Sequence, residues 1–429
     1  MANKNYLTGM ILVTSLFFLW AFLHNINPIL IPHLKKACEL SDTQSSFIDV
    51  VVYLGYFVVA IPAGLWMHKF GYKSGIIFGL ILYAAGALMF IPAASERSYT
   101  FFLFALFVIA SGATFLETVA NPYISILGDK NTSEQRLNFA QSFNGVGAFL
   151  APILGGQFIL SGVEHSDAEL KSMSPGALQS YLQSEADTVK TPYLVIGIGV
   201  IVLILLFVFT KLPDVKEDDS AVDSHAPGTN FSVKVLRHRH LAWSVVAQFF
   251  YLGAQVGVGS FFIRYARYVA EIDEKTAAFL WGSIAMVGFM IGRFVGTVLM
   301  RSIKPAALLS AFAAIAMLLL AVGVTTSGKI ALYAVMGVPF FMSIMFPTIF
   351  ALGIKGLGEE TKIASSFLVM SIIGGGFAPL VMGLVSDKTG SIQTAYIVPI
   401  ICFAVVLFYG LKGHRVVHLP ENEKTHPVS

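Results

Sequence analysis

Glu117 is the side chain with the clearest capacity for proton chemistry, because its carboxylate lies inside the long apolar run 99–127. An acidic side chain near the middle of a bilayer costs roughly 2.5 to 3.5 kcal/mol, so such residues usually face a protein interior or a water-filled cavity. Loss of surrounding water favours the protonated form of a carboxyl group, which suits a group that takes up and releases a proton. The alternative is a protonated Glu117 that only holds neighbouring helices together.

Three amide side chains accompany this carboxylate. Asn121 follows Glu117 by four residues, so the two share one helix face. Pro122 loosens the helix there, and freed carbonyl groups can line a cavity. Gln141 and Asn144 stand three residues apart at the start of the next apolar run. Amides donate and accept hydrogen bonds, which suits a ligand with many hydroxyl groups, and the alternative is hydrogen bonding between helices.

A second polar face is predicted from Gln248, Tyr251 and Gln255, which occupy positions i, i+3 and i+7 of one helix. Amides combined with an aromatic ring are typical of sugar sites, where the ring covers the apolar face of the pyranose. The alternative for Tyr251 is a packing role within the membrane.

Four further polar residues lie toward one end of the first two apolar runs, and they are His24, Asn25, Asn27 and Asp49. Their similar depth predicts one polar cluster there. Asp49 is the second candidate for proton coupling, with a helix-end residue in interfacial water as the alternative. His24 is better explained as hydrogen-bonded structure than as a proton relay.

Basic residues within or at the ends of the apolar runs are expected to have gating or structural roles. Arg264 and Arg293 lie inside runs and are expected to pair or to reach toward opposite membrane faces. Lys69 and Arg301 each end a run five residues after a glycine, and this spacing recurs in the eleventh run. The glycine allows a neighbouring helix to approach and the cation stabilises a helix end, so the repeat indicates two related halves.

The composition is that of a membrane protein, since 56% of the residues are hydrophobic and only 12% are charged. A net charge of +3 gives no reason to expect nucleic-acid binding. Cys38 and Cys402 do not suggest a disulfide or a metal set, and no cofactor is expected. The chain contains no His-Glu-x-x-His and no Gly-x-Ser-x-Gly, so we do not expect an enzyme.

A span needs about 20 mostly apolar residues. The polar breaks predict an all-α protein with twelve membrane spans, at 8–33, 44–68, 73–95, 99–127, 137–161, 191–211, 238–270, 275–301, 305–326, 329–357, 362–387 and 392–412.

The polar linker 212–237 divides these spans into six-helix halves, 1–211 and 238–412, followed by the tail 413–429. Lys and Arg are more frequent in the loops on the side of the N-terminus, which predicts that both termini are cytoplasmic. We expect a monomer in a bacterial inner membrane, surrounded by lipid. Twelve spans in two halves resemble the major facilitator superfamily, in which substrate sits near the midplane between halves that rock about it.

Several motifs resemble the fucose:proton symporter family, which includes L-fucose permeases and glucose/galactose transporters. They occur in order along nearly the whole chain, at 115–122, 141–144, 247–255, 263–265, 346–350, 353–355 and 365–370.

The resemblance implies proton-driven uptake of a monosaccharide, with Glu117 at the central acidic position of the family and Asn144 at its sugar-contacting amide. An L-fucose permease of the family has an essential Asp in span one, where this chain has Pro28, preceded by Asn27. Asp49 on the adjoining span is the predicted substitute.

The predicted mechanism is alternating access, with Glu117 protonated from outside and the proton released inside after the sugar. Sodium coupling and facilitated sugar uniport are the nearest alternatives. A sugar sensor without transport is a remote one, because the tail after Lys412 is short for an output domain.

Overall fold

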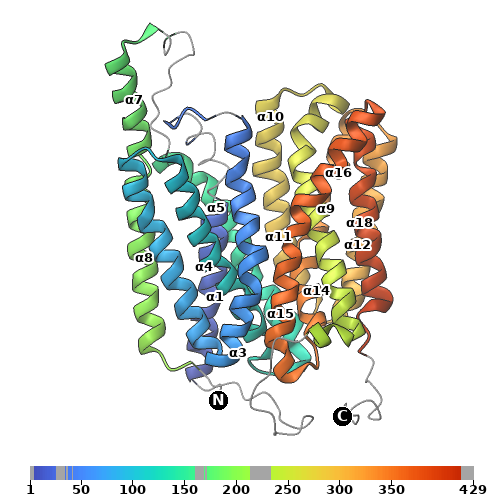
Figure 1. The fold of residues 1–429 in the computed structure, drawn as a ribbon. Helices are drawn as coiled ribbons and strands as arrows, with labels where there is room; N and C mark the ends of the chain where they lie inside the picture. Colours follow the sequence, from blue (N-terminus) through green and yellow to red (C-terminus); the bar gives the residue numbers. More distant parts are fainter. Residues whose placement is uncertain are drawn as a thin grey trace, which may run out of the picture. The chain divides into compact units, whose positions relative to one another are not determined.

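The computed structural model describes residues 4–25, 34, 37–40, 42–159, 169, 172–212 and 233–416. Every regular element in these ranges is a helix (Figure 1). Nine helical stretches in the described part are long and apolar enough to cross a membrane, and the shorter apolar helix Thr8–Phe22 accompanies them. The predicted all-α membrane fold is therefore confirmed.

The first of two compact units comprises Met1–Leu127 and Phe139–Val215. Its helices are α1 (Lys4–His24), α3 (Asp42–Ser95), α4 (Tyr99–Ile126), most of α5 (Ser133–Ile159), α7 (Pro175–Asp187) and α8 (Lys190–Phe209). The helix α3 contains both predicted spans 44–68 and 73–95, which meet without a loop. Its backbone leaves the helical conformation at Gly71 (φ 80°, ψ 172°), a region that glycine tolerates because it lacks a Cβ.

The described part of the predicted break 162–190 includes the 13-residue helix α7, which the apolar pattern did not predict. The helix begins at Pro175, whose fixed φ suits a first helical position. The Ser174 side chain accepts a hydrogen bond from the Ala177 backbone N–H and caps this end. The helix is short and amphipathic, so a search for long apolar runs passes over it.

The second unit comprises Gly128–Asn138 and Lys216–Ser429. Its described elements after the linker are η2 (Val233–Arg237), α9 (Arg239–Ala270), α10 (Glu274–Phe279), η3 (Leu280–Ala285), α11 (Met286–Leu299), α12 (Pro305–Thr325), α13 (Gly328–Met342), α14 (Met345–Gly353), η4 (Gly358–Glu360), α15 (Thr361–Met370), η5 (Ser371–Ile373), α16 (Gly374–Thr389), α17 (Ile392–Ala395), α18 (Ile397–Phe408) and η6 (Tyr409–Gly413).

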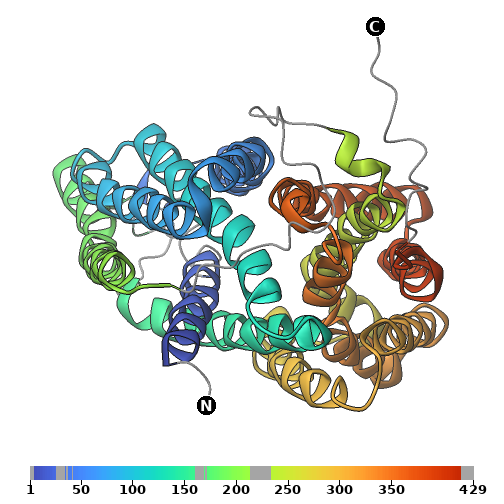
Figure 2. The same ribbon diagram turned by 90° about the horizontal axis from the view of Figure 1, so that it is seen from below.

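The helix α9 is central in the second unit, because it packs against α13, α14, α16 and α18 (Figure 2). Four predicted spans of this unit are not single helices. The span 275–301 consists of α10, η3 and α11, and the span 392–412 consists of α17, α18 and η6. The span 329–357 is divided into α13 and α14 at Ser343–Ile344, and the span 362–387 is divided by η5. Hydropathy does not detect such breaks, because both sides of a break are apolar.

The two cysteines are free thiols. Cys402 is buried, and Cys38 lies partly buried between α1 and α3 in the chain, with its Sγ 3.9 Å from the Arg97 carbonyl oxygen. Burial raises the pKa of the Cys38 thiol, and the nearby Arg97 guanidinium opposes this only in part. At neutral pH the thiol therefore stays protonated and weakly nucleophilic.

Close packing between α3 and α4 depends on Gly112. A Cβ at this position would lie 2.6 Å from the Tyr83 backbone nitrogen and 2.7 Å from the Gly79 carbonyl oxygen. Both atoms belong to the backbone, so relief requires one helix to move.

We expect Gly112→Ala to destabilise the protein by about 1–3 kcal/mol, since overpacking of a well-packed interior costs about that much. The measurement is the melting temperature of the purified protein in detergent. Gly199→Ala is the matched control, because a Cβ there meets nothing within 4 Å. Equal melting temperatures for the two variants would contradict this account of the α3–α4 contact.

Candidate functional site

Glu117 lies in the most deeply buried part of α4, where every residue from Ala110 to Ser125 is buried. The residue itself is only 7% exposed. Asn121, one turn later, donates a hydrogen bond from Nδ2 to the Glu117 backbone oxygen at 2.8 Å. Pro122 has no N–H, so the turn before it has a carbonyl group that the helix does not pair, and the polar side chains gather at this level.

The amides of α4 and α5 are in direct contact. Gln141 donates from Nε2 to the Asn121 Oδ1 at 3.0 Å, and both residues are almost fully buried. The structure thus brings together three predicted site residues: Glu117, Asn121 and Gln141. Asn144 follows Gln141 by one turn of α5 and is half-buried.

Tyr56 of α3 is a member of this cluster that the sequence did not reveal. It is 4% exposed, and its hydroxyl group is hydrogen-bonded to the Glu117 carboxyl group. The only signal in the sequence is a phenol hydroxyl within the apolar run after Asp49, seven residues earlier. Seven residues are two helical turns, or about 10 Å along α3.

The predicted cluster at the ends of the first two spans is only partly described. Asn25 donates from Nδ2 to the Ala21 backbone oxygen at 2.8 Å and thereby extends the hydrogen bonding of its own helix. Asp49 lies in α3 and His24 is the last residue of α1, but their side chains lie outside the described residues, as does the whole of Asn27.

In the second unit, Gln248 and Tyr251 are fully buried on α9, and Gln255 is partly exposed one turn further on. Neither the Nε2 nor the Oε1 of Gln248 has a hydrogen-bond partner among the described residues. A buried amide without partners costs roughly 1 to 3 kcal/mol, so Gln248 is a good candidate for contact with a polar ligand. Tyr251 instead donates from its hydroxyl group to the Met342 backbone oxygen at 3.0 Å.

Arg293 lies on α11 beside the break between α13 and α14, and it is 4% exposed. It donates from Nε to the Ser343 backbone oxygen at 3.2 Å, and its guanidinium carbon lies 4.7 Å from the centre of the Phe289 ring. With Tyr251, it hydrogen-bonds two consecutive carbonyl groups at the end of α13. This geometry favours the structural role predicted for Arg293.

The other predicted gating residues are exposed. Arg264 lies over the Phe261 ring at 4.2 Å, and Lys69 lies over the Phe70 ring at 5.2 Å. Arg301 is exposed just after α11 ends. Their roles in gating stay predictions.

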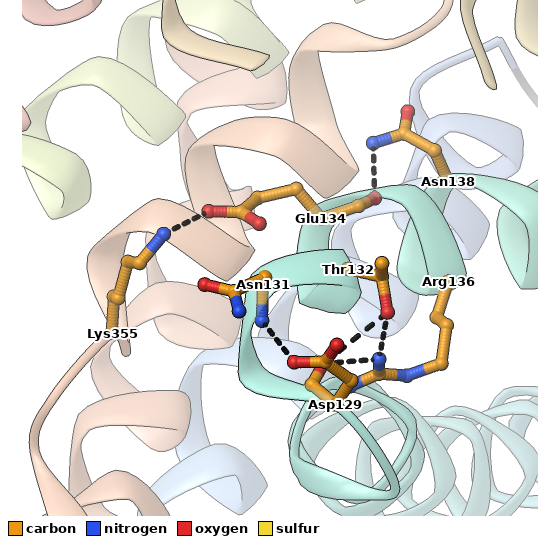
Figure 3. A network of polar contacts seen from close by, with 7 residues as sticks. All are labelled: Asp129, Asn131, Thr132, Glu134, Arg136, Asn138 and Lys355. Carbon is orange, nitrogen blue, oxygen red and sulfur yellow. Dashed lines mark hydrogen bonds and ion pairs between the residues drawn. The ribbon is translucent and has the colours of Figure 1, made fainter. Parts of the chain in front are cut away.

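A polar network is centred on Gly128–Asn138, the connection from α4 into α5, which groups with the second unit (Figure 3). The Lys355 Nζ lies 2.7 Å from the Glu134 Oε1, and the two side chains are 50% and 3% exposed. Asn138 donates from Nδ2 to the Thr348 Oγ1 at 3.1 Å. Sequence reasoning missed this network because its partners are more than 200 residues apart.

Within the same segment, the turn before α5 is stabilised locally. Arg136 donates to the Thr132 Oγ1 at 2.6 Å and to the Asp129 backbone oxygen. The Asp129 carboxylate accepts from the Asn131 backbone N–H at 2.9 Å. Across the described residues, no three His, Cys, Asp or Glu side chains are grouped as metal ligands.

Comparison with known proteins gives concordant matches. The model of the Major Facilitator Superfamily matches residues 10–372. The chain is 45% identical to the L-fucose-proton symporter of Escherichia coli (strain K12), over 95% of this chain and 93% of that protein. It is 40% identical to the glucose/galactose transporter of Brucella abortus biovar 1 (strain 9-941), over 96% of each. A crystal structure of the E. coli fucose:proton symporter FucP superposes with a TM-score of 0.88 at 43% identity, over 95% of this chain and 99% of that one.

The ion pair between Glu134 and Lys355 predicts a specific pattern of stabilities. Lys355→Gln should lower the melting temperature, because it leaves the buried Glu134 carboxylate without its cation, a loss of about 1–3 kcal/mol. The double variant Glu134→Gln/Lys355→Gln should recover most of this loss, since no charge is then left buried.

Lys388→Gln, which removes an exposed cation, is the control and should leave the melting temperature unchanged. A double variant no more stable than Lys355→Gln alone would show that the two side chains do not act as a pair.

Proposed function

Because the chain belongs to the major facilitator superfamily and, within it, to the fucose:proton symporter family, we propose that it imports a monosaccharide together with a proton by alternating access. The names of its relatives support a hexose or a deoxyhexose as substrate, since they refer to L-fucose and to glucose and galactose. They support proton coupling and give no support to sodium coupling.

The observation that carries this proposal is the position of Glu117, a buried residue whose carboxyl group is hydrogen-bonded to the Tyr56 hydroxyl group. The Glu117 backbone oxygen accepts from the Asn121 amide, which in turn accepts from Gln141. In the ionised state the carboxylate accepts a hydrogen bond from the Tyr56 hydroxyl group, which offsets part of the cost of burying its charge. Protonation of Glu117 removes its charge, so the site can close and exclude water at a lower cost. A proton on Glu117 therefore lowers the energy barrier between the state that is open to the outside and the state that is open to the inside.

Each unit offers amides for the sugar in this proposal. Asn144 and Gln141 of α5 supply donors and acceptors, and Gln248 of α9 has both polar atoms free of partners among the described residues. The hydroxyl groups of a sugar can donate a hydrogen bond to the amide oxygen and accept one from the amide N–H. The Tyr251 hydroxyl group already donates to the Met342 carbonyl oxygen, so we propose that its ring forms a wall of the sugar site.

Asp49 is the proposed second carboxylate. It precedes Tyr56 by two turns of α3, and Tyr56 contacts Glu117. We further propose that the entrance for the sugar at the end of the first two predicted spans is lined by His24, Asn25 and Asn27. We assign gating roles to Lys69, Arg264 and Arg301.

The remaining assignments follow from the membrane fold. The chain is a multi-pass membrane protein. We propose that it is a monomer in the bacterial inner membrane with both termini in the cytoplasm. We also propose that its functional halves are 1–211 and 238–412, joined by 212–237 and followed by the tail 413–429.

One proton that crosses a potential of 100 mV contributes about 2.3 kcal/mol, enough for roughly fiftyfold accumulation of sugar. Because each imported sugar removes a proton from the medium, addition of the transported sugar to energy-depleted cells should make the external medium more alkaline. Glu117→Gln should abolish both the pH change and accumulation while it retains sugar counterflow.

Glu359→Gln, at an exposed position, is the control and should behave as wild type. Proton coupling would be excluded by sugar uptake without a pH change in the wild type. Normal accumulation by Glu117→Gln would remove Glu117 from the mechanism.

The identity of the sugar can be found with a panel of L-fucose, glucose, galactose, mannose, fructose and N-acetylglucosamine in counterflow. We expect L-fucose, glucose or galactose to exchange fastest. Asp49→Asn should slow accumulation at least about tenfold, which corresponds to roughly 1.4 kcal/mol, and preserve the order of sugars, because a coupling carboxylate acts on the proton and not on the choice of sugar. A changed order would instead assign Asp49 to the sugar site.

A further inference from the structure

A pocket of about 290 Å³ lies beside the first two turns of α9. Its walls are Leu236 of η2 and Arg239, Ala242, Trp243 and Val246 of α9. Three of these five residues are aliphatic. The pocket therefore offers an apolar wall, one indole ring and one guanidinium group.

The pocket is placed at the end of a membrane span. Arg239 is the first residue of α9, and α9 is one of the apolar stretches long enough to cross a membrane. Trp243 is 37% exposed and Val246 is 38% exposed. A tryptophan at this depth is typical of the boundary between hydrocarbon and headgroups, where its ring is apolar and its N–H can meet polar groups.

Basic residues from a second helix lie at the same end. The Trp243 ring packs edge-on against Phe408, with ring centres 4.8 Å apart. A Cβ placed on Gly413 of η6 would lie 3.3 Å from the Trp243 Cβ, so the end of η6 packs against this pocket residue. The residues on both sides of Gly413 include Lys412 and Arg415, and both are exposed.

Among the described residues, the cations at this place, Arg239, Lys412 and Arg415, have no carboxylate as an ion-pair partner. The nearby Glu360 is engaged by His238, whose Nε2 lies 2.7 Å from the Glu360 Oε2. Figure 2 shows the short helix η2 beside the start of α9, and both elements contribute residues to the pocket.

We propose that this pocket binds an anionic phospholipid, with the phosphate against Arg239 and the upper part of one acyl chain along Ala242 and Val246, which follow Arg239 into the span. An aliphatic wall below a guanidinium group matches the order of groups in a lipid, whereas a soluble phosphate would leave the wall exposed. Lys412 and Arg415 add to the preference for negative headgroups, since each basic residue near an anionic surface contributes about a factor of five in affinity.

The test uses the purified full-length protein in detergent, titrated with dioleoyl-phosphatidylglycerol or dioleoyl-phosphatidylcholine and followed by native mass spectrometry. The wild type should bind phosphatidylglycerol at least about fivefold more tightly than phosphatidylcholine. Arg239→Gln should lose about fivefold, and Lys412→Gln/Arg415→Gln should also bind more weakly. Phosphatidylglycerol with brominated chains should quench the fluorescence of the wild type more than that of Trp243→Phe.

The matched control is Lys388→Gln, an exposed lysine at the end of α16 and outside the pocket, which should bind as the wild type does. Equal affinity of Arg239→Gln and the wild type would overturn the proposal, as would equal binding of the two lipids. Displacement of the lipid by excess inorganic phosphate would assign the site to a free anion instead. All variants are changed at exposed positions or, at Trp243, within the aromatic class, so correct folding is expected and is checked by gel filtration.

Discussion

A polar group that enters the hydrocarbon of a membrane must find its partners inside the protein, and this constraint governs the candidate site. Glu117 meets it through Tyr56 and through the polar turn that ends at Asn121. Gln141 extends the same hydrogen-bonded chain into α5. Three helices of the first unit are therefore held together at one level by these groups. If they handle the proton and the sugar as we propose, the same contacts serve both stability and function.

The second unit satisfies its polar groups in another way. Its helix break at Ser343–Ile344 leaves carbonyl groups that α13 itself does not pair, and side chains from two other helices take them up. Tyr251 binds the Met342 oxygen and Arg293 binds the Ser343 oxygen. A buried cation there needs dipoles around it, and consecutive carbonyl groups supply them. The fully buried Gln248 is an exception in this unit, because neither its Nε2 nor its Oε1 has a hydrogen-bond partner among the described residues, and this makes it a candidate for ligand contact.

The sequence predicted the features that depend on local spacing and failed on those that depend on distant partners. Glu117 and Asn121 are four residues apart, so their contact follows from helix geometry. The contribution of Tyr56 could not be found in this way, because one hydroxyl group in an apolar run carries no periodic signal. The fold class followed from hydropathy. The breaks in the second unit did not, because a broken apolar helix and a continuous one have the same composition.

The segment Gly128–Asn138 bears on how the protein is assembled in the cell. It precedes the linker in the chain but groups with the unit that follows the linker. A ribosome therefore makes Glu134 more than 200 residues before Lys355. The Glu134 carboxylate, which is 3% exposed in the folded protein, can pair with Lys355 only after ten of the twelve predicted spans have been synthesised. Two fragments separated at the linker would each contain half of this ion pair. Such fragments would have to be produced together to complete it, which makes the first half of the chain dependent on the second for its final fold.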